Sequence, residues 1–362
     1  MLPYFTETFG NPASTLNAAG RKAAEAVDSS RETIADILGV KTKEIIFTAG
    51  ATEGNNLALR GIANRAPAER RQIITTAIEH KSVLETCRDL AEQGFDLKIL
   101  PVQRDGRVDI LELKQALSAK TLIVSVQAAS NEIGTLQDIE SISDLAHQQG
   151  AFVHCDAAQA VGKVPFDFLA CGADLISLSA HKLYGPKGTG LLFIRGGVRG
   201  LPISPVQLGG GQEYGLRPGT LNVPGIVGLA AALKLQDPED SARTRKLRDE
   251  FETTLLARLP GAFRNGAAQL RLPNNCSITL PGVDAEALLA NLPELALSTG
   301  SACTSGAPDP SHVLLAIGLS REKALSTIRV GLGRSTSIED LGLATDLIVA
   351  AVARLRGLAA AR

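Results

Sequence analysis

Short apolar segments alternate with amphipathic ones between residues 43 and 195, and no other feature of the sequence restricts the fold as strongly. Stretches of helical period, such as 81–93 and 138–149, separate several of the apolar segments. Continuous apolar strands that alternate with helices are typical of a mostly parallel sheet covered on both faces. We therefore predict an α/β fold with a mostly parallel seven-stranded sheet. Its strands are expected at 44–48, 72–76, 97–100, 121–127, 151–155, 174–179 and 190–194.

The chain of 362 residues is long enough for two domains. A helical segment at 18–38 precedes the alternating block, and a Gly- and Pro-rich stretch at 196–219 follows it. Helical patterns then return, with shorter strands between them and a last helix near 338–355. We predict a large α/β domain at 1–235 and a smaller α+β domain at 236–362.

Composition and charge exclude several classes of protein. Lys plus Arg is 37 and Asp plus Glu is 38, a net charge of −1, which argues against a nucleic-acid binder held by a general basic field. No apolar stretch reaches the ~20 residues of a membrane span, and the first residues lack a signal-peptide pattern. The five cysteines include no CxxC pair. We expect a cytoplasmic protein with no resident metal site and no direct nucleic-acid or membrane partner.

Two segments suggest an anion site. The small-residue turn at 48–52 stands where a strand gives way to a helix, so backbone N–H groups and the helix dipole there favour an anion. Most turns of this kind only make room for neighbouring backbone. After strand 174–179, Ser179 and His181 can donate to an anion while Lys182 points elsewhere. Most lysines at strand ends are simply solvated, but this combination suggests a phosphate-anchored aldehyde site with a Schiff-base lysine.

Asp156 stands at the carboxyl end of another buried strand. A buried carboxylate is costly unless it is paired with a cation. The protonated pyridine nitrogen of pyridoxal phosphate is one such cation, and a carboxylate beside it keeps the cofactor an effective electron sink. A role for Asp156 in capping the following helix is the alternative.

Six motifs occur in an order that resembles the cysteine desulfurases of the NifS/IscS type, which are class V, fold-type I pyridoxal-phosphate enzymes. The motifs lie at 48–53, 79–81, 131–134, 156–159, 179–182 and 298–306. The resemblance extends over essentially the whole chain and implies the fold of a fold-type I transferase. It also implies a reaction in which sulfur is removed from L-cysteine to give L-alanine and an enzyme persulfide.

The resemblance implies a role for each matched residue. Lys182 would form the Schiff base with pyridoxal phosphate and later move the substrate Cα proton, and His80 would stack on the pyridine ring. Asn131 and Arg329 would bind the substrate carboxylate, which suits the planar fork of arginine. Thr220 would reach the phosphate of the other subunit, so a homodimer is implied. The implied cofactor contacts are Ala51, Thr52, His80, Asp156, Gln159, Ser179, His181, Lys182 and Thr220.

Cys303 is the candidate nucleophile and, with Lys182 and His80, completes the implied catalytic set. It lies in a stretch of Ser, Thr, Gly and Pro that is unsuited to a core. An ordinary cysteine has a pKa of about 8.5 and supplies some thiolate near neutral pH. The resemblance implies that the persulfide passes to an iron–sulfur scaffold or a tRNA-thiolation protein. Cys303 is also the one residue expected to contact a transferred iron–sulfur cluster.

Other interpretations stay open. The chain could be another class V enzyme, either an aminotransferase, which would not need Cys303, or a selenocysteine lyase. It could also be a truncated, non-catalytic paralogue, because family members usually begin further upstream, with an Asn-Ala-Thr-Thr-like segment. Against a non-catalytic role, Lys182, Asp156, His80 and Cys303 are all present.

Overall fold

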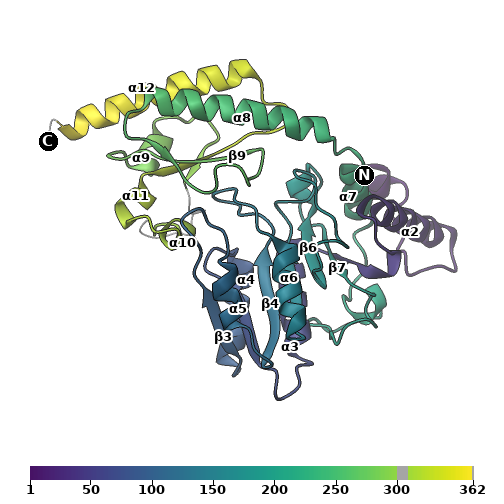
Figure 1. The fold of residues 1–362 in the computed structure, drawn as a ribbon. Coiled ribbons are helices and arrows are strands. Elements are labelled where there is room, and N and C mark those ends of the chain that lie inside the picture. Colours follow the sequence, from purple (N-terminus) through teal and green to yellow (C-terminus); the bar gives the residue numbers. More distant parts are fainter. Residues whose placement is uncertain (300–308, 361–362) are drawn as a thin grey trace. The chain divides into compact units, whose positions relative to one another are not determined.

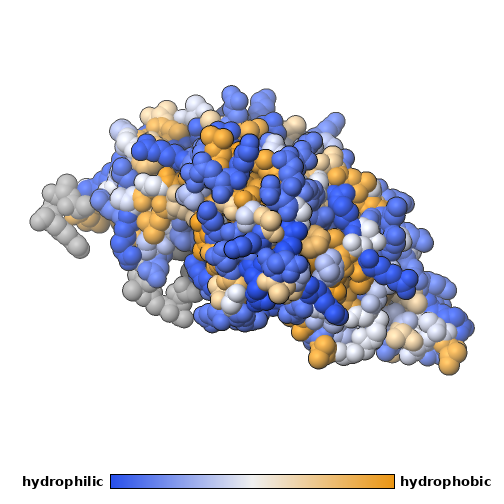
Figure 2. Space-filling view, turned by 60° about the horizontal axis from the view of Figure 1, so that its bottom comes forward, coloured by the Kyte–Doolittle hydropathy of each residue, from blue (hydrophilic) through white to orange (hydrophobic). Residues whose placement is uncertain are grey.

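The computed structural model describes residues 1–299 and 309–360. The chain divides into two compact units. The first unit comprises Met1–Leu100, Ile110–Ala128 and Gln137–Gln236, and the second comprises Pro101–Asp109, Ala129–Leu136 and Asp237–Arg362. Among the described residues, no helix is long and apolar enough to cross a membrane. Hydrophobic side chains stand among hydrophilic ones on the face that Figure 2 presents.

The first unit is built on a seven-stranded sheet in the order β1-β7-β6-β5-β4-β2-β3. The five strands β6, β5, β4, β2 and β3, which are neighbours in this order, pair in parallel. Strand β7 is antiparallel to both of its neighbours, β1 and β6. The predicted α/β class and mostly parallel sheet are therefore confirmed, and each predicted strand agrees within one residue at either end. The strands are β1 (Ile45–Thr48), β2 (Gln72–Thr76), β3 (Asp96–Leu100), β4 (Thr121–Gln127), β5 (Phe152–Asp156), β6 (Leu175–Ser179) and β7 (Gly190–Ile194).

Helices cover this sheet, and Figure 1 shows α3 to α6 beside its strands. Helix α2 shows how particular residues determine where a helix begins and ends. At its start the Asn17 side chain accepts from the Gly20 N–H, and at its end Gly39 takes the left-handed conformation at φ 67°. Apolar faces of α3 and α4 bury Leu59 and Val83 against Ile73 of the sheet. The helices are α1 (Pro3–Thr6), α2 (Ala18–Leu38), α3 (Ala51–Ala63), α4 (Lys81–Glu92), α5 (Ile110–Ala116), α6 (Ile139–Gln148) and α7 (Val223–Lys234), with 3-10 turns η1 (Thr42–Glu44), η2 (Ala180–Leu183) and η3 (Glu213–Gly215).

A buried ion pair fixes the glycine-rich loop that leads to Thr220. The Glu213 carboxylate accepts from Arg31 Nη2 at 2.5 Å and from the Phe47 backbone N–H at 2.7 Å. Glu213 and Tyr214 both have positive φ, 47° and 58°, which is unfavourable for residues with a side chain. The ion pair therefore holds a strained segment of the loop against β1.

The second unit contains a four-stranded antiparallel sheet in the order β10-β11-β9-β8. Its core packs Phe251 of α8 and Ile348 of α12 against Ile278 and Ile328 of the sheet. Arg258 Nη1 and Asp346 Oδ1, 2.5 Å apart, join the long helices α8 and α12, which run side by side in Figure 1. The elements are α8 (Pro238–Arg258), β8 (Phe263–Arg264), β9 (Asn275–Thr279), α9 (Ala285–Ala290), β10 (Ser298–Thr299), α10 (His312–Ala316), α11 (Arg321–Leu325), β11 (Thr327–Gly331) and α12 (Ile338–Ala360).

The two units differ from the predicted domains in one respect. The sequence analysis places one boundary after residue 235, so that each domain is a continuous stretch, whereas 101–109 and 129–136 belong to the second unit. Residues 129–136 belong to the second unit because their backbone pairs with residues near 271. The Leu136 N–H donates to the Leu270 carbonyl at 2.9 Å, and the Leu272 N–H donates to the Gly134 carbonyl at 2.8 Å. Pairings of this kind leave no periodic pattern in the sequence. The predicted boundary after residue 235, as a division between two functional domains, remains a prediction.

Candidate cofactor site

The turn before α3 and the end of β6 meet in the first unit. Gly50 has φ 148° and ψ 179°, a conformation that is essentially restricted to glycine. A Cβ on Gly190 would lie 2.6 Å from Gly50 Cα, so the two backbones approach closely. The Ala51 N–H donates to Ser179 Oγ at 2.7 Å. The structure therefore brings together two of the predicted phosphate contacts and leaves the hydroxyl hydrogen of Ser179 available to an anion.

Positive charge gathers beside this turn. His181 and Lys182 lie in η2, which ends at Tyr184 with φ 64°. Partial burial lowers the pKa of His181, and the charges of Lys182, Lys187 and Lys163 lower it further. Mutual repulsion among cations is relieved when an anion binds between them. The charge of this cluster therefore fits a phosphate group.

Asp156 ends β5 and is buried, with 7% of its surface exposed. Its Oδ2 accepts from Asn55 Nδ2 at 2.8 Å, and its Oδ1 accepts from the Ala158 N–H at 3.0 Å. The second bond is a local turn contact: turns, not a helix, follow Asp156, so the helix-capping alternative is not confirmed. Within the described ranges, Asp156 forms no ion pair, so a ring cation such as a protonated pyridine would give this buried carboxylate the partner that it lacks.

Lys163 contacts a predicted site residue, and the sequence analysis did not single it out. Its Nζ donates to Gln159 Oε1 at 2.7 Å, which leaves the Gln159 amide hydrogens for other acceptors. Burial and, to a smaller extent, the charge of Lys182 together lower the pKa of Lys163 to about 7. The signal for this contact in the sequence was a lysine four residues after Gln159, with only Ala, Val and Gly between them.

His80 and Glu79 belong to the same motif but differ in burial. His80 is exposed and caps α4, with its Nδ1 accepting from the Ser82 N–H at 3.1 Å. Glu79 is fully buried, and its Oε1 accepts from Thr76 Oγ1 at 2.6 Å. Burial raises the pKa of Glu79 to about 8, and the charge of Asp156 raises it too. Glu79 is therefore mostly protonated at neutral pH and does not repel Asp156.

This raised pKa predicts a pH dependence of stability. Between about pH 4.5 and 8 the folded chain holds a proton on Glu79 that the unfolded chain has lost, so the free energy of unfolding falls as the pH rises through this window. The slope approaches about 1.4 kcal/mol per pH unit. Glu79→Gln keeps an acceptor for Thr76 and should remove this contribution. Urea unfolding of both cofactor-free chains at several pH values measures the difference, and equal slopes would show that Glu79 is ionised in the fold.

Asn131 and Arg329 are neighbours in the second unit. Arg329, on β11, donates through Nη1 to the Asn131 carbonyl oxygen at 2.9 Å and through Nη2 to Ser298 Oγ at 3.2 Å. The contact uses the backbone of Asn131, so its side-chain amide is not held by Arg329. A guanidinium fixed in this way has further N–H groups for a carboxylate.

Four cysteines lie in the described part of the chain, and all are buried: Cys87, Cys155, Cys171 and Cys276. Burial raises the pKa of each thiol, that of Cys87 to about 12. A protonated, inaccessible thiol is a poor nucleophile. Cys303 falls outside the described residues, and its predicted role rests on the sequence.

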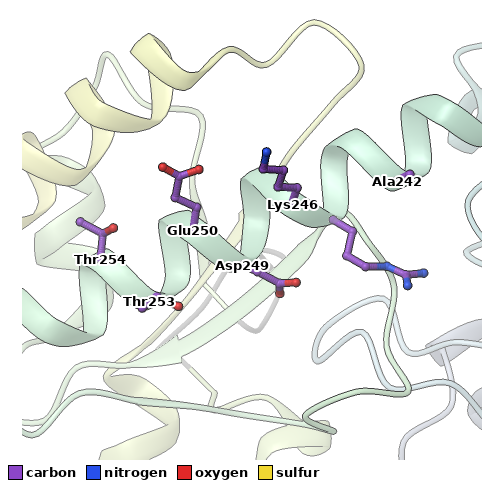
Figure 3. A pocket seen from close by; sticks show the side chains of 7 residues that line it. Ala242, Lys246, Asp249, Glu250, Thr253 and Thr254 are labelled. Carbon is purple, nitrogen blue, oxygen red and sulfur yellow. The ribbon is translucent and has the colours of Figure 1, made fainter.

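Thr220 is exposed and lines a hollow of about 500 Å³ with Asn11, Thr15 and Arg31. In the part of the chain that the structure describes, no hydrogen bond joins Thr220 to Thr52, Ser179 or His181. A second hollow, shown in Figure 3, is lined entirely by residues of α8, among them Lys246 and Glu250. None of the predicted site residues lines that second hollow, and one helix alone gives it no opposing wall.

This chain is similar to known proteins over most of its length. The family described as Aminotransferase class-V matches residues 1–343. The cysteine desulfurase IscS of Neisseria meningitidis is 44% identical over 361 residues, which are 99% of this chain and 89% of that protein. A solved NifS-like protein has a TM-score of 0.88 at 35% identity and covers 97% of this chain and 94% of its own. The structure of SspA in complex with cysteine has a TM-score of 0.81 at 36% identity, with coverages of 92% and 94%.

Proposed function

We propose a function from one premise: the chain belongs to the cysteine desulfurases of the class-V aminotransferase family. The resemblance predicted from six motifs is thereby confirmed. The proposed reaction removes the sulfur of L-cysteine, leaves L-alanine and loads the sulfur on Cys303. The observation that carries it is the occurrence in one unit of Ser179, the cations around His181 and the buried carboxylate of Asp156, which has no ion-pair partner among the described residues. The related SspA structure holds cysteine, which supports this substrate.

Pyridoxal phosphate fits the residues present. Thr52, Ser179 and His181 would hold its phosphate, Asp156 would pair with its ring nitrogen, and Lys182 would bind its aldehyde. Gln159, oriented by Lys163, would offer an amide hydrogen to the ring oxygen. When bound, this cofactor supplies an electron sink for charge that develops at the substrate Cα.

The chain's own residues supply the rest of the reaction. Arg329 and Asn131 bind the substrate carboxylate and so orient the Cα–H bond. Lys182 Nζ takes the Cα proton and later returns a proton to carbon. The Cys303 thiolate attacks the substrate sulfur: an S–S bond forms, the Cβ–S bond breaks, and its electron pair stays with the carbon that becomes the methyl group of alanine.

The direct test is product analysis. With pyridoxal phosphate, L-cysteine and a thiol reductant, we expect alanine and sulfide in equal amounts. Absence of alanine would contradict the proposal, and so would transfer of the amino group to a keto acid. Selenocysteine lyase is the second candidate, and a strong preference for selenocysteine over cysteine in the same assay would favour it.

We infer a homodimer in which Thr220 serves the partner's site. In its own chain Thr220 lines a hollow, and two large apolar residues that precede it in the chain are exposed, Leu208 at 86% and Tyr214 at 56%. A subunit interface over this loop would cover these side chains. Thr220→Ala should weaken cofactor binding roughly tenfold, since one hydrogen bond to a charged group is lost, without changing the mass in solution. A monomer by light scattering that keeps full cofactor occupancy would contradict this inference.

The acceptor of the persulfide sulfur is proposed to be another protein, either an iron–sulfur scaffold or a tRNA-thiolation protein. The cytoplasmic location expected from the composition remains a proposal.

A further inference from the structure

A buried asparagine connects two residues of the proposed cofactor site. Asn55 lies on α3 and has no exposed surface. Its Nδ2 donates to Asp156 Oδ2 at 2.8 Å and to Ser82 Oγ at 2.9 Å. Ser82 Oγ in turn lies 2.8 Å from His80 Nδ1. The path from Asp156 to His80 therefore runs through two side chains that the proposed function does not use.

The direction of each hydrogen bond in this path is determined. An ionised carboxylate only accepts, so the Asn55 amide must present its NH₂ group to Asp156, and its two hydrogens serve Asp156 and Ser82. Ser82 Oγ thus accepts from Asn55, and its own hydrogen is free to go to His80 Nδ1. The Ser82 backbone N–H also donates to that nitrogen, at 3.1 Å. His80 Nδ1 therefore accepts from both the hydroxyl and the backbone N–H of Ser82, so the neutral ring carries its hydrogen on Nε2.

We propose that Asn55 and Ser82 are positioning residues: Asn55 orients the Asp156 carboxylate with one amide hydrogen and, through Ser82, holds His80 in the Nε2–H tautomer. The inference rests on the proposed function for its consequence, which is that His80 offers a hydrogen-bond donor to the site. Thr52 and Asn55 are three residues apart on α3 and so share one face of that helix. One helix therefore holds the phosphate end of the site and also the carboxylate for the ring nitrogen.

The first test needs no cofactor. In the cofactor-free chain labelled with ¹⁵N at its five histidines, His80→Gln identifies the His80 signals. At a pH about two units above the ordinary histidine pKa of about 6.5, we expect His80 to be the Nε2–H tautomer in wild type. In Ser82→Ala, which retains only the backbone donor, a measurable Nδ1–H fraction should appear. An Nδ1–H fraction in wild type equal to that in Ser82→Ala would overturn the proposal, and this readout is independent of any enzymatic activity.

The second test measures the affinity for pyridoxal phosphate by absorbance titration. Asn55→Leu should weaken binding roughly tenfold, the effect of losing one hydrogen bond to a charged group. Ser82→Ala should stay within twofold of wild type, because the bond between Asn55 and Asp156 remains. Asn56→Ala is the matched control for the contact with Asp156, since Asn56 is the next residue of α3 and bonds instead to Arg60, to Thr86 and to the backbone carbonyl of Thr52.

The two tests separate the failure of this inference from that of the proposed function. If Asn55→Leu is folded by circular dichroism and binds as tightly as wild type, the role of Asn55 is wrong. If Asn55→Leu does not fold, Asn55→Ala replaces it, and the wild-type tautomer still decides the role of Ser82. If wild type itself binds no pyridoxal phosphate, the proposed function fails, whereas the tautomer of His80 continues to test the hydrogen-bond path.

Discussion

Lys182→Ala should abolish the visible absorbance that the protein gains with pyridoxal phosphate and should lower alanine formation by roughly 10³-fold. Both effects follow because one amine forms the covalent bond to the aldehyde and moves the Cα proton. Absorbance spectra and an alanine assay with L-cysteine measure them. Lys182 lies in η2, directly after β6, and follows Ser179 and His181 in the chain.

Lys187→Ala is the control for the covalent bond alone, because Lys187 is an exposed lysine of the same segment that adds charge to the cluster around His181 but has no proposed covalent role. It should keep the absorbance. A folded Lys182→Ala that still forms the coloured species would contradict the assignment. Lys163, with its pKa lowered to about 7, would then be the next amine to test.

Cys303→Ser should retain the cofactor spectrum and lose the sulfur chemistry. Lys182, Asp156 and His80 are unchanged in this variant, so L-cysteine should still bind and perturb the spectrum. Alanine formation should fall by at least about 10²-fold, since a hydroxyl at neutral pH is a far weaker nucleophile toward sulfur than a thiolate.

The four buried cysteines provide the controls for Cys303. Their thiol pKa values are raised by burial, so they supply almost no thiolate near neutral pH. Cys87→Ala, Cys155→Ala, Cys171→Ala and Cys276→Ala should each keep the alanine assay positive per folded molecule, whatever they cost in stability. Alanine at the wild-type rate from Cys303→Ser would reject the nucleophile assignment.

The sequence predicted the sheet well because its strands, apart from the mostly exposed β3, are buried on both faces. A strand such as β4, buried over its whole length, is a continuous apolar run that periodicity finds easily. Position in the chain also predicted that Asp156 and Ser179 lie near each other, since they end the neighbouring parallel strands β5 and β6 at the same end of the sheet.

The supporting residues could not be predicted in the same way. Asn55 and Asp156 are 101 residues apart, and Asn55 and Ser82 are 27 apart, so only the packing of α3 against α4 and the sheet brings them together. Glu79 stands next to His80 in the sequence, yet one is fully buried and the other exposed. The assignment of 129–136 to the second unit depends on backbone pairing with residues near 271, which no local pattern encodes.

The most direct measurement of the central claim is mass spectrometry of the resting enzyme after a brief exposure to L-cysteine without reductant. The account predicts one added sulfur atom on the peptide that carries Cys303, its loss on treatment with a thiol reductant, and no such adduct in Cys303→Ser or Lys182→Ala. An added sulfur on Cys87, Cys155, Cys171 or Cys276, or alanine release with no sulfur on any cysteine, would contradict it.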